Sequence, residues 1–258
     1  MNFVRRLANK LSAFLGWIEI RPRRTFTALA AFKHYLTDLN EFSSRTNWKV
    51  LKYPCLFDLN QEAGSCGEYF FQDIYVAKRI IKQNPGRHID VGSRVDGFIA
   101  HLACVRRVEV LDIRPMISTV NEIDFHQADI TGISADWFDA ADCLSCLHAL
   151  EHFGLNRYGD GIDPDGWKAG FQNLQKILKK GGVLWLSVPV GKQRVEFNAH
   201  RVFDPQTIYN FASGLGLALQ EFAYLDKGKI TVSSDHENDF RRLANANYNL
   251  GIFKFTKG

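Results

Sequence analysis

The pattern of apolar and polar positions divides the chain into two parts. Apolar residues recur at helical spacing over residues 3–18, with basic residues between them, and a second helical stretch is expected over about residues 25–42. Residues 43–67 contain proline and glycine breakers and follow no regular period. We therefore expect residues 1–67 to form a helical N-terminal extension with an irregular linker, and residues 68–258 to form the main domain.

Strand-like and helix-like segments alternate throughout the main domain. Seven apolar runs are typical of strands, at residues 87–92, 107–115, 122–130, 140–150, 182–190, 215–225 and 247–257. Helical stripes are expected over residues 68–83, 95–104, 164–180 and 204–213. Asp163 and Asp204 are the expected N-caps of the last two helices. The alternation predicts an α/β fold: a Rossmann-like, doubly wound, mostly parallel seven-stranded sheet with helices on both faces. The last two strands have no clear helix between them, which predicts an antiparallel addition at the end of the sheet.

Composition and charge narrow the class of protein. The apolar fraction of 46% and the aromatic fraction of 13% supply a sizeable core and exclude a wholly disordered chain. Six basic residues and one acidic residue lie within positions 1–24, so this segment alone exceeds the net charge of +4 of the whole chain. Nucleic-acid-binding proteins more often carry basic residues on the folded domain, so no nucleic-acid partner is predicted. Two interpretations of residues 1–24 stay open: peripheral contact with a membrane, or packing on the main domain or a second subunit.

The cysteine pattern favours a cytoplasmic protein, with attachment to the inner face of the membrane as a further option. Five cysteines are present, an odd number, and three lie in apolar runs, so no disulfide framework is predicted. Cys143 and Cys146 lie three apart in a predicted strand and face opposite sides, which disfavours a redox or zinc pair. No stretch approaches roughly 18 uninterrupted apolar residues, and the short apolar run before Glu19 is interpreted as retained rather than as a signal peptide.

Acidic residues stand at the ends of three successive predicted strands. Asp90 and Gly92 end the first, Asp112 ends the second and Asp129 ends the third. Ligands of open α/β sheets bind at these carboxyl ends, and Gly92 would let the backbone approach a ligand closely. Asp112 would then accept the ribose hydroxyls of a nucleoside, and Asp129 would accept the adenine amine. The alternative is that all three acids are ordinary strand-end caps.

The loop after the first strand indicates which nucleoside fits. A dinucleotide needs G-x-G-x-x-G, but Arg94 and Asp96 stand where small residues would be expected, and no phosphate-binding G-x-x-x-x-G-K-[ST] exists. This disfavours a dinucleotide-dependent sugar-modifying enzyme. A positively charged cofactor without phosphates, S-adenosylmethionine, fits nearby acids better.

At this point the sequence resembles the class I S-adenosylmethionine-dependent methyltransferases. The segments HIDVGS, VEVLDIRP, ADI and LKKGGVLWLSVP stand in the order of that family's first, second, third and fifth strand motifs, and LHALEH is similar to the segment after its fourth strand. The longer motifs DVGSRVDGFIAHL, LHALEHFGLNRYGDGIDPDGW and SVPVGKQRVEFNAHRVFDP resemble a bacterial family of uncharacterised methyltransferase-like proteins, often found among genes for surface polysaccharides. The resemblance covers about residues 68–257. It implies methyl transfer, with surface-polysaccharide biosynthesis as the setting.

Histidines and acids that follow the fourth and fifth strands are candidates for the chemistry. His148, Glu151 and His152 fit the H-x-x-E-H pattern of zinc proteases, but a buried strand precedes them, so no metal site is predicted. An acceptor hydroxyl needs a base, for which His148, His152 and His200 are candidates, with Glu151 orienting an imidazole and Arg201 clamping an anionic group of the acceptor. For each histidine the alternative is packing beneath the site.

The predicted function is transfer of a methyl group from S-adenosylmethionine to a hydroxyl of a polar small molecule or glycan. The alternative is a non-catalytic, methyltransferase-like binding or scaffold module attached peripherally to the membrane. The sequence predicts no oligomeric state.

Overall fold

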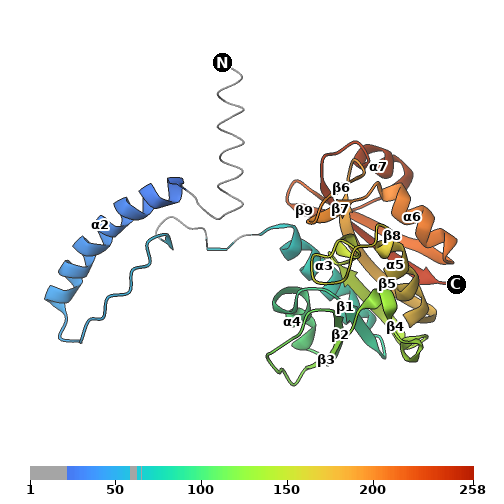
Figure 1. Ribbon diagram of the computed structural model, residues 1–258, viewed down its shortest axis with the longest axis horizontal. Coiled ribbons are helices and arrows are strands. Elements are labelled where there is room, and N and C mark those ends of the chain that lie inside the picture. Colours follow the sequence, from blue (N-terminus) through green and yellow to red (C-terminus); the bar gives the residue numbers. More distant parts are fainter. Residues whose placement is uncertain (1–21, 59–62, 65) are drawn as a thin grey trace, which may run out of the picture. The chain divides into compact units, whose positions relative to one another are not determined.

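The computed structural model describes residues 22–58, 63–64 and 66–258 (Figure 1). The chain divides into two units, residues 1–65 and residues 66–258. In the first unit, α2 (Pro22–Arg45) contains the helical stretch expected over residues 25–42. The amphipathic helix expected over residues 3–18, and with it the predicted membrane contact, lies outside the described residues. Within the part of the chain that is described, no helix has both the length and the hydropathy needed to cross a membrane.

The second unit is built on an eight-stranded sheet with the order β3-β2-β1-β4-β5-β10-β8-β9. Its strands are β1 (His88–Val91), β2 (Val108–Asp112), β3 (Ile123–Gln127), β4 (Ala141–Leu147), β5 (Leu178–Val190), β8 (Leu217–Asp226), β9 (Lys229–Val232) and β10 (Asn249–Lys257). The pairs β1–β2, β1–β4, β2–β3 and β4–β5 are parallel, whereas β10 is antiparallel to β5 and β8. The mostly parallel, Rossmann-like sheet and its antiparallel end are therefore confirmed.

The edge strand of the large sheet and the helix that follows it were not revealed by the apolar pattern. The edge strand β9 pairs antiparallel with β8, so the sheet has eight strands instead of the predicted seven. Helix α7 (His236–Leu243) lies between β9 and β10, and its N-cap Asp235 accepts a hydrogen bond from the backbone N–H of Asn238. Only Phe240 and Leu243 of this helix are buried, which is too few apolar positions to show a helical period.

Helices cover both faces of the sheet and bury two separate apolar cores (Figure 1). The helices of one core are α3 (Glu68–Gln83), η2 (Val95–Ile99) and α4 (Ala100–Ala103); those of the other are α5 (Gly166–Ile177), α6 (Pro205–Gly214) and α7. Cys143 and Cys146 belong to different cores, as expected from their spacing, and both are buried free thiols. Burial raises the pKa of Cys143 to about 12, so this thiol stays protonated at neutral pH.

The short elements and helix caps complete the unit. Asp204 caps α6 by accepting the N–H of Gln206 at 2.9 Å, as predicted. The predicted cap at Asp163 is wrong: α5 has Asp165 at its N-cap position, and Asp163 accepts the N–H of Asp165 within the preceding turn. The remaining elements are the 3₁₀ turns η3 (Ile130–Gly132), η4 (Ala135–Trp137) and η5 (Leu150–His152), and a hairpin of β6 (Arg194–Glu196) with β7 (His200–Val202).

Candidate active site

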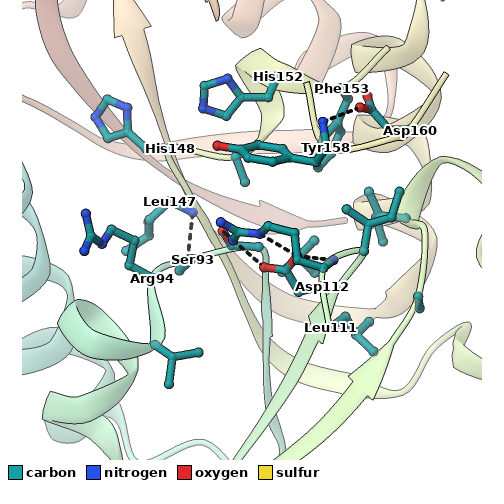
Figure 2. Close-up of a pocket in the computed structure, with 18 of the residues that line it drawn as sticks. Ser93, Arg94, Leu111, Asp112, Leu147, His148, His152, Phe153, Tyr158 and Asp160 are labelled. Carbon is teal, nitrogen blue, oxygen red and sulfur yellow. Dashed lines mark hydrogen bonds and ion pairs between the residues drawn. The ribbon is translucent and has the colours of Figure 1, made fainter. Parts of the chain in front are cut away.

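A cavity of about 480 Å³ opens at the carboxyl ends of the parallel strands. The order of the sheet reverses between β1 and β4, which is where ligands bind in open α/β sheets. The predicted site residues that line this cavity are Gly92, Asp112, Asp129, His148 and His152. Figure 2 shows Asp112, His148 and His152 in this lining. The predicted site residues outside its lining are Asp90, Glu151, His200 and Arg201.

Gly92 brings the first loop close to the end of β4. Its φ of +71° is a conformation that side chains other than glycine rarely adopt, and its N–H donates to the carbonyl of Leu111 at 2.9 Å. A Cβ at this position would lie 2.8 Å from the Cβ of Ala149. Both the backbone conformation and the close approach therefore require glycine here.

Asp90, which was predicted to bind the cofactor, lies outside the cavity lining. Its carboxyl group is fully buried and accepts hydrogen bonds from the Ser93 N–H (3.0 Å), the Ser93 hydroxyl (2.7 Å) and the Ser145 hydroxyl (2.5 Å). Burial raises the pKa of Asp90 to about 7, although the bonds from Ser145 and Ser93 act in the opposite direction. Asp90 therefore braces the first loop against β4.

Asp112, the last residue of β2, lines the cavity, but a side chain of the loop that follows binds its carboxylate. Arg114 donates to one oxygen from its N–H at 2.8 Å and from Nε at 3.0 Å, and to the other oxygen from Nη2 at 2.5 Å. The Arg114 guanidinium carbon also lies 4.8 Å from the centre of the Tyr158 ring. The acid expected to accept ribose hydroxyls is thus held by a bidentate pair.

Asp129 acts as a turn cap and also lines the cavity. Its Oδ1 accepts the Thr131 N–H at 2.8 Å and the Thr131 hydroxyl at 2.7 Å, which starts the turn η3. Oδ2 has no hydrogen-bond partner in the described part of the chain and is the oxygen available to a ligand.

Arg94, which stands where a small residue was expected, is paired within its own loop. Its Nε and Nη2 donate to the two oxygens of Asp96 at 3.0 and 2.8 Å. Both side chains line the cavity and are mostly exposed to solvent, with relative exposures of 63% and 73%. The charge of Arg94 is therefore balanced at the mouth of the cavity.

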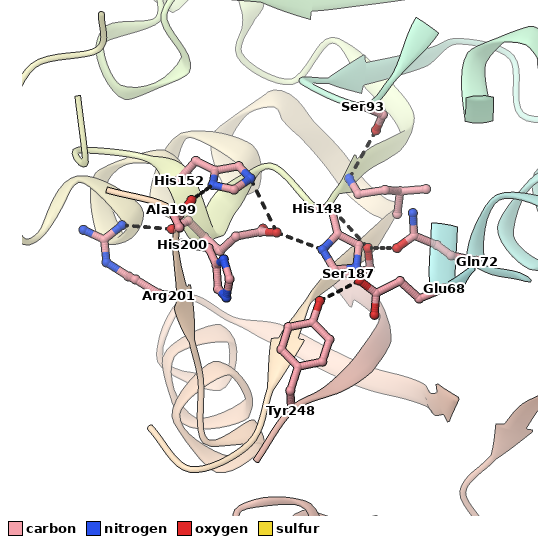
Figure 3. Close-up of polar contacts among 12 residues, drawn as sticks. Glu68, Gln72, Ser93, His148, His152, Ser187, Ala199, His200, Arg201 and Tyr248 are labelled. Atoms are coloured by element: carbon pink, nitrogen blue, oxygen red, sulfur yellow. Dashed lines mark hydrogen bonds and ion pairs between the residues drawn. The ribbon is translucent and has the colours of Figure 1, made fainter. Parts of the chain in front are cut away.

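His148 lines the cavity (Figure 3) and forms a buried pair with Glu151, which lies behind the lining. β4 ends at Leu147, and His148 adopts a φ of +51° while its N–H donates to the carbonyl of Ser187 at 3.0 Å. The Nδ1 of His148 lies 2.8 Å from Glu151 Oε1, and its Nε2 is buried without a partner among the described residues. Burial lowers the pKa of His148, but the adjacent Glu151 carboxylate outweighs this effect, and the net pKa is raised.

His152 has its own partner and a different protonation preference. Its Nδ1 donates to the carbonyl of Ala199 at 2.7 Å, which leaves Nε2 as the acceptor of the neutral ring, 3.8 Å from Glu151 Oε1. Burial lowers the pKa of His152, and this outweighs the opposing effect of Glu151. Among the described residues, no group of three or more His, Cys, Asp or Glu side chains is placed to hold a metal ion.

His200 and Arg201 lie behind the cavity wall rather than in it. His200 Nε2 is 3.6 Å from Glu196, and its ring centre is 6.0 Å from that of Tyr248. Arg201 is buried, and its guanidinium donates to four backbone carbonyls, at Glu151 (3.3 Å), Phe153 (2.6 Å), Asp163 (3.4 Å) and Pro164 (3.1 Å). Arg201 was predicted to clamp an anionic group of the acceptor. The structure does not support this role, because backbone carbonyls accept the hydrogen bonds of its guanidinium.

Sequence comparison places this site in a family. Residues 102–254, more than half of the chain, match the family model described as "Caenorhabditis protein of unknown function, DUF268". The chain belongs to the DUF268 family. The matched region of this DUF268 protein includes Asp112, Asp129 and the segment from His148 to Asp165. No curated protein matches the sequence.

Solved structures with a similar fold include methyltransferases. A candidate sarcosine dimethylglycine methyltransferase from Galdieria sulphuraria is 12% identical, with a TM-score of 0.52 over 72% of the DUF268 chain and 85% of its own. The N-methyltransferase NodS from Bradyrhizobium japonicum is 14% identical, with a TM-score of 0.50 over 73% and 96% of the two chains. The (4+2)-cyclase SpnF is 12% identical, with a TM-score of 0.51 over 72% and 80%. The DUF268 chain thus has the fold of class I S-adenosylmethionine-dependent methyltransferases, a fold that also carries other chemistry.

The residues of the DUF268 cavity fit a nucleoside cofactor in size and wall chemistry. The volume lies within the range of small-molecule sites, and Leu111, Phe125 and Ile130 provide apolar walls beside Asp129. The exception is Asp112, both of whose oxygens bind Arg114. A ribose can reach Asp112 only if Arg114 releases or shares that carboxylate.

Residues 153–165 of the DUF268 chain form a braced loop that contributes cavity residues not predicted from the sequence. Asp160 accepts the N–H groups of Gly154 (2.6 Å) and Tyr158 (3.3 Å), and a Cβ on Gly154 would overlap the Asp163 carbonyl oxygen. The loop thereby places Arg157 and Tyr158 in the lining. In the sequence, these residues are marked only by their position between Gly154 and Gly159. Their place in the lining depends on the folded loop and on contacts such as that of Arg157 with Ala199.

Proposed function

We propose that this DUF268 protein transfers a methyl group from S-adenosylmethionine to a hydroxyl of a polar small molecule or glycan. The observation that carries the proposal is His148, which lines the cavity, pairs through Nδ1 with the buried Glu151, and has a buried Nε2 without a partner among the described residues. The fold shared with the Galdieria and Bradyrhizobium proteins supports methyl transfer as the class of reaction. A setting in surface-polysaccharide biosynthesis is supported by the resemblance of the longer motifs.

His148 is the general base of the proposed reaction. A hydroxyl is a poor nucleophile until its proton is removed, and a positioned histidine is suited to that step. Because Glu151 Oε1 accepts the Nδ1–H, the lone pair of the neutral ring lies on Nε2. The proton taken up at Nε2 produces an imidazolium that the neighbouring Glu151 carboxylate stabilises. S-adenosylmethionine, when bound, supplies an electrophilic methyl group on its sulfonium.

The chain's own residues would hold the nucleoside part. Gly92 permits close approach of the first loop, Asp129 Oδ2 is open to an amine, and Asp112 would accept ribose hydroxyls once Arg114 withdraws. We therefore expect Asp112→Asn to raise the Kd of S-adenosylhomocysteine at least about tenfold, the effect of losing a hydrogen bond to a charged group. Arg114→Met removes the competing donor and is expected to lower that Kd. Isothermal titration calorimetry measures both.

Asp136→Asn is the control for this series, because Asp136 is exposed and lies outside the cavity lining. The Kd of S-adenosylhomocysteine for this variant should match that for the wild type within about twofold. Absence of binding to folded wild-type protein at millimolar S-adenosylhomocysteine would remove the cofactor from the proposal.

A non-catalytic binding or scaffold module is the second candidate. The observation that favours it is the bidentate Asp112–Arg114 pair, which occupies the carboxylate that a ribose would need. The same calorimetric titration separates the two candidates, because a module without cofactor shows no heat of binding in either the wild type or Arg114→Met.

A further inference from the structure

We propose that Arg157 is an anion-binding subsite on the histidine side of the cavity, so that the acceptor carries a carboxylate or phosphate group. This inference rests on the proposed function, because it names the class of acceptor for the same site. It assigns to Arg157 the recognition that the sequence had suggested for Arg201.

Arg157 differs from the other cavity arginines in lacking a carboxylate partner. Arg94 is paired with Asp96 and Arg114 with Asp112. No acidic side chain among the described residues forms an ion pair with Arg157, although the loop carries Asp160. The Asp160 oxygens accept backbone N–H groups instead, at Gly154 and Tyr158. The cavity therefore contains one exposed guanidinium whose charge the described chain leaves unbalanced.

The position of Arg157 is defined by contacts at one end of its guanidinium. Nη1 donates to the carbonyl of Ala199 at 2.7 Å and lies 3.3 Å from His152 Nδ1. With Nη1 engaged, Nε and Nη2 form the free edge, and they have no partner among the described residues. Two parallel N–H donors match the two oxygens of a carboxylate or phosphate. The guanidinium is thus fixed in place while a bidentate edge stays available.

Tyr158 separates this subsite from the nucleoside side of the cavity. Figure 2 shows its ring lying between the two histidines and Asp112. The guanidinium carbons of Arg157 and Arg114 lie 5.2 and 4.8 Å from the ring centre, within cation–π distance, and the His152 ring meets the Tyr158 ring edge-on at 5.7 Å. An anion on Arg157 would therefore lie beside His152, and a hydroxyl of the same molecule could extend toward the proposed base, His148.

The test is an NMR titration of the arginine Nε–H signals of the full chain with inorganic phosphate, acetate and uncharged glucose. The Arg157 signal is identified as the one missing from Arg157→Gln. We expect it to shift saturably with phosphate or acetate and not with glucose, and the anion with the lower Kd identifies the group recognised. A control variant, Arg241→Gln, removes an exposed arginine of α7 whose guanidinium donates to Asn238 Oδ1. An Arg157 signal that does not move, or that moves equally with glucose, would overturn the subsite.

Calorimetry with S-adenosylhomocysteine then separates the subsite from the cofactor site. Arg157→Gln should leave the Kd of S-adenosylhomocysteine within about twofold of the wild-type value. The same variant should raise the Kd of the anion at least about tenfold, as loss of a charge-assisted hydrogen bond predicts. An equal loss of S-adenosylhomocysteine affinity would place Arg157 in the cofactor site and contradict the inference. If the wild type binds the anion through Arg157 but binds no S-adenosylhomocysteine, the methyltransferase proposal fails and the anion subsite stands.

Discussion

Replacing His148 by glutamine should lower kcat for methyl transfer by at least about 100-fold, the usual contribution of a general base. Glutamine is preferable to alanine because its amide can donate to Glu151 Oε1, the atom that His148 contacts at 2.8 Å. Alanine would leave the buried carboxylate without its partner, and a fall in stability would then obscure the result. Single-turnover rates, with the Kd of S-adenosylhomocysteine as the control for an intact site, provide the measurement.

The pH dependence of kcat/KM distinguishes the two cavity histidines. A base must be neutral, so the rate falls as the pH drops through its pKa. Burial lowers the pKa of His148, but Glu151 outweighs this effect and the net pKa lies above the ordinary histidine value of 6.5. If His148 is the base, the fall in rate on acidification should therefore be centred at a pH above 6.5. Burial sets the pKa of His152 below that value, so the same loss would occur at a lower pH. Glu151→Gln should lower the apparent pKa of this profile if His148 is the base. An apparent pKa below 6.5 in the wild type would assign the role of base to His152.

Replacing Arg201 by methionine should lower the free energy of unfolding by roughly 3 kcal/mol. The guanidinium is buried and donates to four backbone carbonyls, and methionine leaves them without these donors. We further expect faster amide hydrogen exchange in residues 153–165, because three of these carbonyls belong to Phe153, Asp163 and Pro164. Urea unfolding of the wild type and of the variant gives the difference directly.

Arg241→Met controls for loss of charge, since Arg241 is exposed and its substitution should change stability by less than about 0.5 kcal/mol. Unchanged unfolding of Arg201→Met together with a higher KM for the acceptor would contradict the bracing role. That outcome would support the clamp expected from the sequence.

Residues with a strong local signature were placed well by sequence. The predicted strands coincide with β1 to β5, β8 and β10, and Asp204 with Pro205 marks the start of α6. Gly92 was predicted to let the backbone approach a ligand; what the structure shows is a close internal contact, because a Cβ there would meet Ala149. β9 and α7 were missed because no residue of β9 and only two residues of α7 are buried, so neither shows an apolar pattern.

In the candidate site, the local sequence pattern predicts the positions of residues but not their hydrogen-bond partners. The sequence predicted that Asp112, Asp129 and His148 come at strand ends, and parallel strands bring such ends to one edge. It did not indicate which donors each acid would bind. Asp90 bonds Ser145, 55 positions away, and Arg201 bonds Phe153, 48 positions away.

By itself, therefore, the sequence determined the order of strands and helices, the parallel sheet and the edge at which polar residues gather, because these follow from periodicity and short-range sterics. Only the tertiary structure decided that Asp90 is buried, that Arg114 holds Asp112, that Glu151 pairs with His148, and that Arg157 rather than Arg201 enters the cavity. The physical reason is that the protonation and availability of a polar side chain depend on burial and on partners brought together by folding, and neither is encoded in the spacing of residues along the chain.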